Sequence, residues 1–123
     1  MAMKLPEPDF VQMFGEIHML KAPLIYFDEL EQKRHKVPAG FQSDLASVPR
    51  IIPALIVNDM GAITYPSFLH DFMYEEKYTS RATADRIFRQ FAIQRGLAKP
   101  RAWIAWAGVR LNLYQAYKWN RNA

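Results

Sequence analysis

The spacing of hydrophobic positions changes about halfway along the chain. In the first third, short runs rich in aromatic and β-branched residues predict strands at residues 11–14, 17–20, 24–27 and 33–37. Gly15-Glu16 separates the first two runs and predicts a tight hairpin. We therefore expect a small antiparallel β-meander over about residues 10–37.

Residues 38–53 interrupt this pattern. They contain three prolines, a glycine and several small polar residues, which together predict a long loop. Apolar side chains at Phe41, Leu45 and Val48 indicate that the loop is pinned to the core and ordered.

Helical spacing dominates the second half, with helices predicted at about residues 64–77, 80–95 and 100–118. Pro66 suits a first turn, Ser80 is a good N-cap and Gly96 is a good C-terminal signal. One face of the second helix is apolar at helical spacing: Ala84, Ile87, Phe88, Phe91 and Ala92. The predicted fold class is α+β, with residues 1–123 forming a single domain.

Composition fits a folded domain, since 50% of the 123 residues are hydrophobic and 23% are charged. The absence of cysteine excludes disulfides, thiolate metal sites and a cysteine nucleophile, and favours a reducing compartment. No apolar run is long enough for a signal peptide or a membrane span, so we expect neither.

The net charge of +4 is concentrated near the C-terminus. From Arg95 onward there are six basic residues, no acidic residue and all three tryptophans. Such a segment could meet anionic lipid, an acidic protein or nucleic acid, although no clear nucleic-acid recognition motif is present. The alternative is a solvated helix face whose aromatic side chains belong to the core.

Candidate chemistry is concentrated between Phe68 and Phe88, in the stretch FLHDFMYEEKYTSRATADRIF. On a helix, His70 and Tyr74 share one face, whereas Asp71 points about 100° away. His70 is thus suited to act on a water and Asp71 to hold a cation. The carboxylate that orients His70 must come from elsewhere, and Asp85 on the next helix is well placed.

The acidic residues favour calcium over zinc, because calcium prefers several oxygen ligands. Asp44 and Asp71 could supply carboxylates and the loop at Leu45 a carbonyl oxygen. Zinc would need more nitrogen or sulfur ligands. Neither His18 nor His35 has a second potential metal ligand at the spacing of a known metal-binding motif. This indicates that both are ordinary histidines, either on the surface or pairing with a neighbouring side chain.

Each of these features also has a purely structural interpretation. Asp85 could pair with Arg81 or Arg89 one turn away on the same helix. Ser43-Asp44 could cap a turn, and His70 could pack in the core.

Three motifs together resemble a small family of unknown function found in phages, prophages and bacteria. They are Gly40-Phe41-x-Ser43-Asp44-x-Ala46-Ser47-Val48-Pro49-Arg50, then His70-Asp71-x-x-Tyr74, then Ala84-Asp85-x-x-Phe88. The resemblance spans about residues 24–110 and implies a phage or prophage setting. Localisation would then be cytoplasmic in the infected host or associated with the virion.

The His70-Asp71 motif, followed by Asp85, is also similar to the catalytic helices of secreted phospholipases A2, especially the bacterial kind. This resemblance implies an antiparallel pair of catalytic helices in the three-helix half. It implies His70 as general base, Asp85 as its partner and Tyr74 as support. Asp44, the Leu45 carbonyl and Asp71 would hold calcium. Ala46 and Met73 stand where those enzymes carry cysteines.

Three functions follow as hypotheses. The first is a phospholipase-A2-like, metal-dependent ester hydrolase of phage or prophage origin. The second is a non-catalytic virion or assembly component that uses the same polar cluster as a structural clamp. The third is a hydrolase of another ester, an amide or cell-wall material. Anionic phospholipid or other phage proteins are the expected partners of the basic, tryptophan-bearing C-terminal helix, and the sequence leaves the oligomeric state open.

Overall fold

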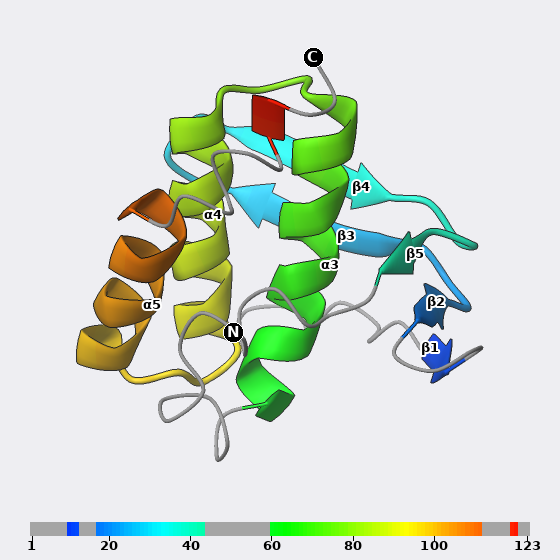
Figure 1. Cartoon of the computed structure of the whole chain (residues 1–123), viewed down its shortest axis with the longest axis horizontal. Helices are drawn as coiled ribbons and strands as arrows, with labels where there is room; N and C mark the ends of the chain where they lie inside the picture. Colours follow the sequence, from blue (N-terminus) through cyan, green and yellow to red (C-terminus); the bar gives the residue numbers. More distant parts are fainter. Residues whose placement is uncertain (1–9, 13–16, 44–59, 112–118, 121–123) are drawn as a thin grey trace. The chain divides into compact units, whose positions relative to one another are not determined.

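The computed structural model describes residues 10–12, 17–43, 60–111 and 119–120, and the chain divides into two compact units, residues 1–44 and 45–123. The first unit contains the described strands and the second contains three helices (Figure 1). The α+β class is therefore confirmed. The single-domain organisation stays a prediction.

The first unit contains two antiparallel sheets. Strands β1 (Phe10–Gln12), β2 (His18–Leu20) and β5 (Gln42–Ser43) form one, in the order β1-β2-β5. Strands β3 (Leu24–Asp28) and β4 (Lys33–Val37) form the other. The arrangement differs from a continuous meander because β2 pairs with β5, a strand that lies inside the predicted loop at residues 38–53.

Backbone hydrogen bonds extend the pairing of β2 towards β5. The Leu20 amide donates to the Phe41 carbonyl at 3.0 Å, and the Gly40 amide donates to the Leu20 carbonyl at 2.8 Å. Gly40 has a φ of +90°, a conformation that side-chain-bearing residues rarely adopt. The glycine thus lets the chain turn back onto β2.

The β3–β4 hairpin is in register from Leu24 opposite Val37 to Asp28 opposite Lys33. Buried Asp28 closes the turn, since its Oδ1 atom accepts from the Leu30 amide at 3.1 Å. His35 lies opposite Tyr26 and is also buried, so the prediction of a surface histidine there is wrong, whereas the pairing role fits. Alternation along the strands puts both side chains on the buried face.

The second unit contains α3 (Met60–Glu76), α4 (Arg81–Gln94) and α5 (Lys99–Leu111). Helix α3 begins one turn earlier than predicted, which leaves Pro66 inside the helix rather than in its first turn. The predicted continuation of the last helix over residues 112–118 lies outside the described residues. Helix α4 packs against both α3 and α5 (Figure 1), and the short connections make sequential helices antiparallel neighbours.

Both predicted ends of α4 are confirmed by their capping geometry. The Ser80 hydroxyl accepts from the Thr83 amide at 3.1 Å. At the other end the Gly96 amide donates to the Ile93 carbonyl and the Leu97 amide to the Ala92 carbonyl, the two bonds of a Schellman motif. Gly96 has a φ of +112°, as this motif requires. Leu97 is thereby turned into the core, where it is buried.

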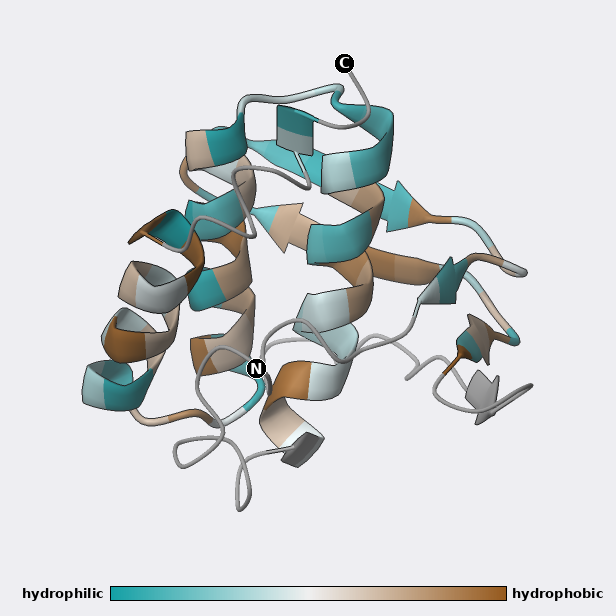
Figure 2. Ribbon diagram, viewed as in Figure 1, coloured by the Kyte–Doolittle hydropathy of each residue, from teal (hydrophilic) through white to brown (hydrophobic). Residues whose placement is uncertain are grey.

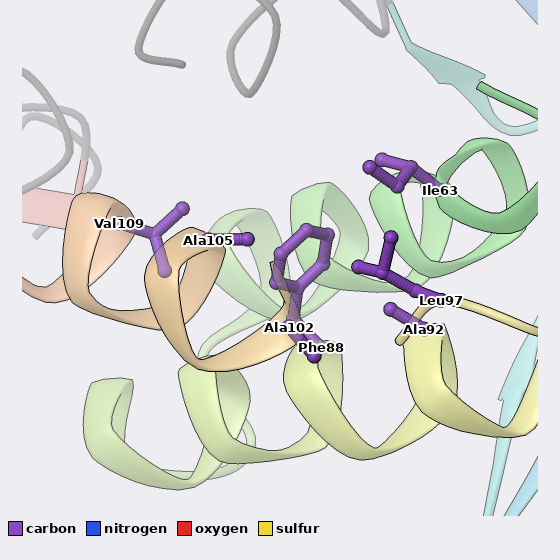
Figure 3. Packing of buried hydrophobic residues seen from close by; sticks show 7 residues of the cluster. All are labelled: Ile63, Phe88, Ala92, Leu97, Ala102, Ala105 and Val109. Carbon is purple, nitrogen blue, oxygen red and sulfur yellow. The ribbon is translucent and has the colours of Figure 1, made fainter. Parts of the chain in front are cut away.

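A cluster of buried apolar residues joins all three helices (Figure 3): Ile63, Phe88, Ala92, Leu97, Ala102, Ala105 and Val109. Small alanines on α4 and α5 allow the two backbones to approach closely around Phe88. Hydrophobic and hydrophilic bands alternate along α4 (Figure 2), as expected for a helix with one buried face. Among the described residues, no helix is long and apolar enough to cross a membrane.

Candidate functional site

The two motif helices bring His70 and Asp85 into direct contact. The His70 Nε2 atom lies 2.7 Å from the Asp85 Oδ1 atom, and both side chains are buried. His70 is on α3 and Asp85 is near the start of α4, so a short connection between antiparallel helices suffices to place them together. The predicted histidine–carboxylate pair is present.

Tyr74 shares the same carboxylate oxygen. Its hydroxyl donates to Asp85 Oδ1 at 2.6 Å, and its ring centroid lies 4.3 Å from that of His70. The ring of Phe88 lies 5.2 Å from the imidazole on α4. The imidazole is therefore hydrogen-bonded to Asp85 and packed against the rings of Tyr74 and Phe88, with Tyr74 one turn away as its spacing predicted.

Arg110 occupies the other carboxylate oxygen. Its Nη1 atom donates to Asp85 Oδ2 at 3.1 Å from the last turn of α5. The alternative prediction that Asp85 pairs with Arg81 or Arg89 is wrong. Arg81 donates instead to Tyr74, and Arg89 lies over the ring of Trp103.

Arg81 joins the tyrosine to the end of α5. Its Nε atom donates to the Tyr74 oxygen at 3.0 Å, and its Nη2 atom donates to the carbonyls of Val109 at 2.9 Å and Arg110 at 3.1 Å. These carbonyls belong to the last described turn of α5. The planar fork of a guanidinium suits such a set of acceptors. Arg81 thus fixes the helix end from which Arg110 reaches Asp85.

The network keeps Asp85 ionised. Burial alone would raise the pKa of Asp85, but hydrogen bonds from His70, Tyr74 and Arg110 and the charge of His70 outweigh it and lower the pKa. Burial and the neighbouring carboxylate raise the pKa of Tyr74, which therefore stays protonated and donates. Opposite an ionised carboxylate, the His70 Nε2 atom carries a proton. In the neutral ring the basic nitrogen is then Nδ1.

Trp119 packs against this cluster. Its ring meets the Tyr74 ring edge-on at 5.0 Å between centroids, and the Lys77 ammonium lies 5.4 Å from the Trp119 ring. A residue close to the C-terminus therefore contacts the tyrosine that binds Asp85.

Only one of the three predicted calcium ligands lies in the described part of the chain. Asp71 is half-buried on α3, on a different face from His70, as helix geometry predicted. Asp44 and Leu45 lie outside the described residues. Within residues 10–12, 17–43, 60–111 and 119–120, no group of three or more His, Asp or Glu side chains is arranged to hold a metal ion.

Sequence reasoning missed the roles of Arg81 and Arg110. One signal was available for Arg110, because it is the lone charged residue in an otherwise apolar stretch from Ala102 to Leu111. An isolated charge in such a stretch indicates a buried partner. The sequence gives no comparable signal for Arg81, since two of its three acceptors are backbone carbonyls and the third is the uncharged Tyr74 hydroxyl.

Comparison with known families gives one match. The family model of DUF1353, described as a protein of unknown function, matches residues 18–109. That segment contains His70, Tyr74, Arg81 and Asp85 and ends one residue before Arg110. No significant match was found among curated proteins or among solved structures.

Proposed function

We propose a hydrolytic function for this chain, which belongs to the DUF1353 family of proteins of unknown function. The proposed activity is that of a phospholipase-A2-like, metal-dependent ester hydrolase. In it, His70 activates water and Asp85 orients the imidazole.

The observation that carries the proposal is the 2.7 Å contact from His70 Nε2 to Asp85 Oδ1. A carboxylate on one ring nitrogen fixes the tautomer and leaves the other nitrogen as the base. Here that base is Nδ1. It would take a proton from water while the water oxygen attacks the ester carbonyl, and would return the proton to the departing alkoxide.

The rest of the network supports this role for Asp85. The imidazolium formed during the reaction needs an ionised carboxylate beside it, and the lowered pKa of Asp85 meets that requirement. Arg110 neutralises the far oxygen, and Tyr74 binds the near one. The carboxylate is thus held ionised and in a fixed orientation.

Calcium is proposed as the metal, with Asp71, Asp44 and the Leu45 carbonyl as its ligands. The half-buried Asp71 carboxylate is an oxygen donor of the kind that calcium prefers. When bound, the ion would polarise the ester carbonyl and stabilise negative charge on its oxygen. A phage or prophage origin is proposed with this activity, from the motif resemblance.

The test is hydrolysis of a phospholipid and of a soluble chromogenic ester by the full chain across a calcium titration. We expect calcium-dependent turnover that falls at least about a hundredfold in His70→Ala, the effect of losing a general base. His18→Ala removes a histidine of the other unit and should leave the rate unchanged. Activity that is retained in His70→Ala, or a wild-type chain that shows no activity at any calcium level, would contradict the proposal. An amide and a cell-wall fragment in the same assay test the broader hydrolase.

A structural clamp in a virion or assembly protein is the second candidate. The near-complete burial of the His70–Asp85 pair favours it, since His70 is 1% and Asp85 0% exposed. A clamp predicts that Asp85→Asn lowers the melting temperature by several degrees while the wild-type chain hydrolyses none of these substrates. Turnover in the wild-type chain that requires His70 would rule out the clamp as the sole function.

A further inference from the structure

The side of α5 that faces away from the core is apolar. Ala102, Ala105 and Val109 of this helix are buried. On the opposite side Trp103 is 50%, Ile104 53% and Leu111 81% exposed. At 100° per residue these three side chains fall within about 100° of one another around the helix. One helix thus has a buried apolar face and an exposed one.

Cations border the exposed face. The Arg89 guanidinium lies 3.9 Å from the centroid of the Trp103 ring, and Lys99 and Arg101 are exposed on the first turn of α5. The sequence contains no Asp or Glu after Asp85, while residues 86–123 hold eight Lys and Arg. Every charged residue that follows Asp85 in the sequence is therefore basic.

We infer that this α5 surface (Trp103, Ile104, Leu111, Arg89, Lys99 and Arg101) docks on an anionic phospholipid bilayer. Such a bilayer matches both features of the surface. Its anionic headgroups attract the cations, and the boundary of its acyl chains accommodates the apolar side chains. Tryptophan is favoured at that boundary because its ring is apolar with a polar edge.

Two other occupants fit the surface less well. A nucleic acid would pair with the cations but leave Ile104 and Leu111 without an apolar partner. A second copy of the chain, related by a two-fold axis, would bring the same cations face to face. Charge and apolar character together favour lipid.

The test is co-sedimentation of the full chain with vesicles of phosphatidylcholine containing about 30% phosphatidylglycerol. We expect binding to these vesicles, little binding to pure phosphatidylcholine, and weakening as salt rises from about 0.05 to about 0.5 M. The double variant Ile104→Glu/Leu111→Glu should bind these vesicles at least about tenfold more weakly than the wild type. It replaces apolar side chains that would insert into the bilayer with negative charges that the anionic headgroups repel.

Leu30→Glu is the matched control, because Leu30 is an exposed leucine of the other unit. It should bind vesicles as the wild type does. Circular dichroism melts of both variants check that the fold is intact, and hydrolysis of a soluble ester should be unchanged in the double variant. A failure of docking is therefore distinct from a failure of the proposed catalysis.

Several outcomes would overturn the inference. They are no binding to anionic vesicles, equal binding to neutral vesicles, or equal loss in Leu30→Glu. A dimer in sedimentation velocity that the double variant dissolves would assign the surface to a second copy. Binding to duplex DNA that the double variant retains would assign the cations to nucleic acid.

Discussion

Arg110 and His70 bind opposite oxygens of the same buried carboxylate. Arg110 lies 3.1 Å from Asp85 Oδ2, and His70 lies 2.7 Å from Asp85 Oδ1. The two donors come from α5 and α3, so Asp85 on α4 joins all three helices. The orientation of the histidine thus depends on a residue that lies outside both motif helices.

Removing the arginine should leave a buried carboxylate short of a counter-ion. We expect Arg110→Gln to lower the free energy of unfolding by about 2–4 kcal/mol, somewhat less than the loss of a fully buried pair, because the Arg110 side chain is 30% exposed. Urea denaturation measures this. Lys99→Gln, which removes an exposed cation from the same helix, should change the value by less than about 0.5 kcal/mol. Equal effects of the two substitutions would contradict a specific ion pair.

Tyr74 and Arg81 should be energetically coupled, because the tyrosine oxygen accepts from Arg81 while its hydroxyl donates to Asp85. Tyr74→Phe is expected to cost about 1–3 kcal/mol, since it leaves a buried acceptor and a donor short of a partner. A double-mutant cycle with Arg81→Gln should give a coupling energy above about 0.5 kcal/mol. Strict additivity would mean that the two side chains act independently.

Acid should destabilise the fold through Asp85. Its pKa is lower in the folded state than its ordinary value of about 4, so the stability it provides is complete above pH 4 and lost as pH falls further. Unfolding free energies measured between about pH 5 and pH 2 should fall more steeply for the wild type than for Asp85→Asn. Glu75→Gln, which removes an exposed carboxylate of α3, should keep the steep fall.

At high pH the fold should lose stability through Tyr74, in the direction of pH opposite to that for Asp85. Its pKa is raised in the folded state, so its stabilising effect is complete below pH 10, the ordinary tyrosine value, and is lost as pH rises above it. Tyr74→Phe should flatten this loss. Tyr78, whose pKa burial raises to about 12, acts in the same direction. Because half of its side chain is exposed, Tyr78→Phe should have the smaller effect.

The turn after α4 should tolerate substitution poorly. Gly96→Ala is expected to cost about 1–2 kcal/mol, because an alanine at a φ of +112° is strained. Gly61→Ala is the matched control, since Gly61 lies in the exposed first turn of α3 with open space around it. That substitution should be neutral or stabilise by up to about 1 kcal/mol. A thermal melt distinguishes the two.

The parts of this site that the sequence predicted are those governed by local geometry. Helical spacing put His70 and Tyr74 on one face, and a short connection brought Asp85 to them. Ser80 marks the start of α4 and Gly96 the turn at its end, and both assignments depend only on the capping preferences of a few neighbouring residues. Such features need no knowledge of the tertiary fold.

The features that were missed depend on contacts distant in sequence. Arg110 is 25 residues from Asp85, and Arg81 is 28 residues from the Val109 carbonyl. No periodicity encodes either contact. The β2–β5 pairing escaped for the same reason, because the two residues of β5 are too short a run to predict a strand. The calcium prediction at Asp44 and Leu45 stays a prediction, since those residues lie outside the described structure.

The backbone conformation of the Schellman turn at Gly96 sets the direction in which α5 leaves α4, and so the position of Arg110. Helix α5 starts at Lys99, and Arg110 lies about 16 Å further along its axis at 1.5 Å per residue. A tilt of about 10° at the turn would displace the guanidinium by about 3 Å, as much as the length of its bond to Asp85. The orientation of the His70 imidazole, which depends on Asp85 and so on Arg110, is thereby sensitive to the backbone conformation of Gly96.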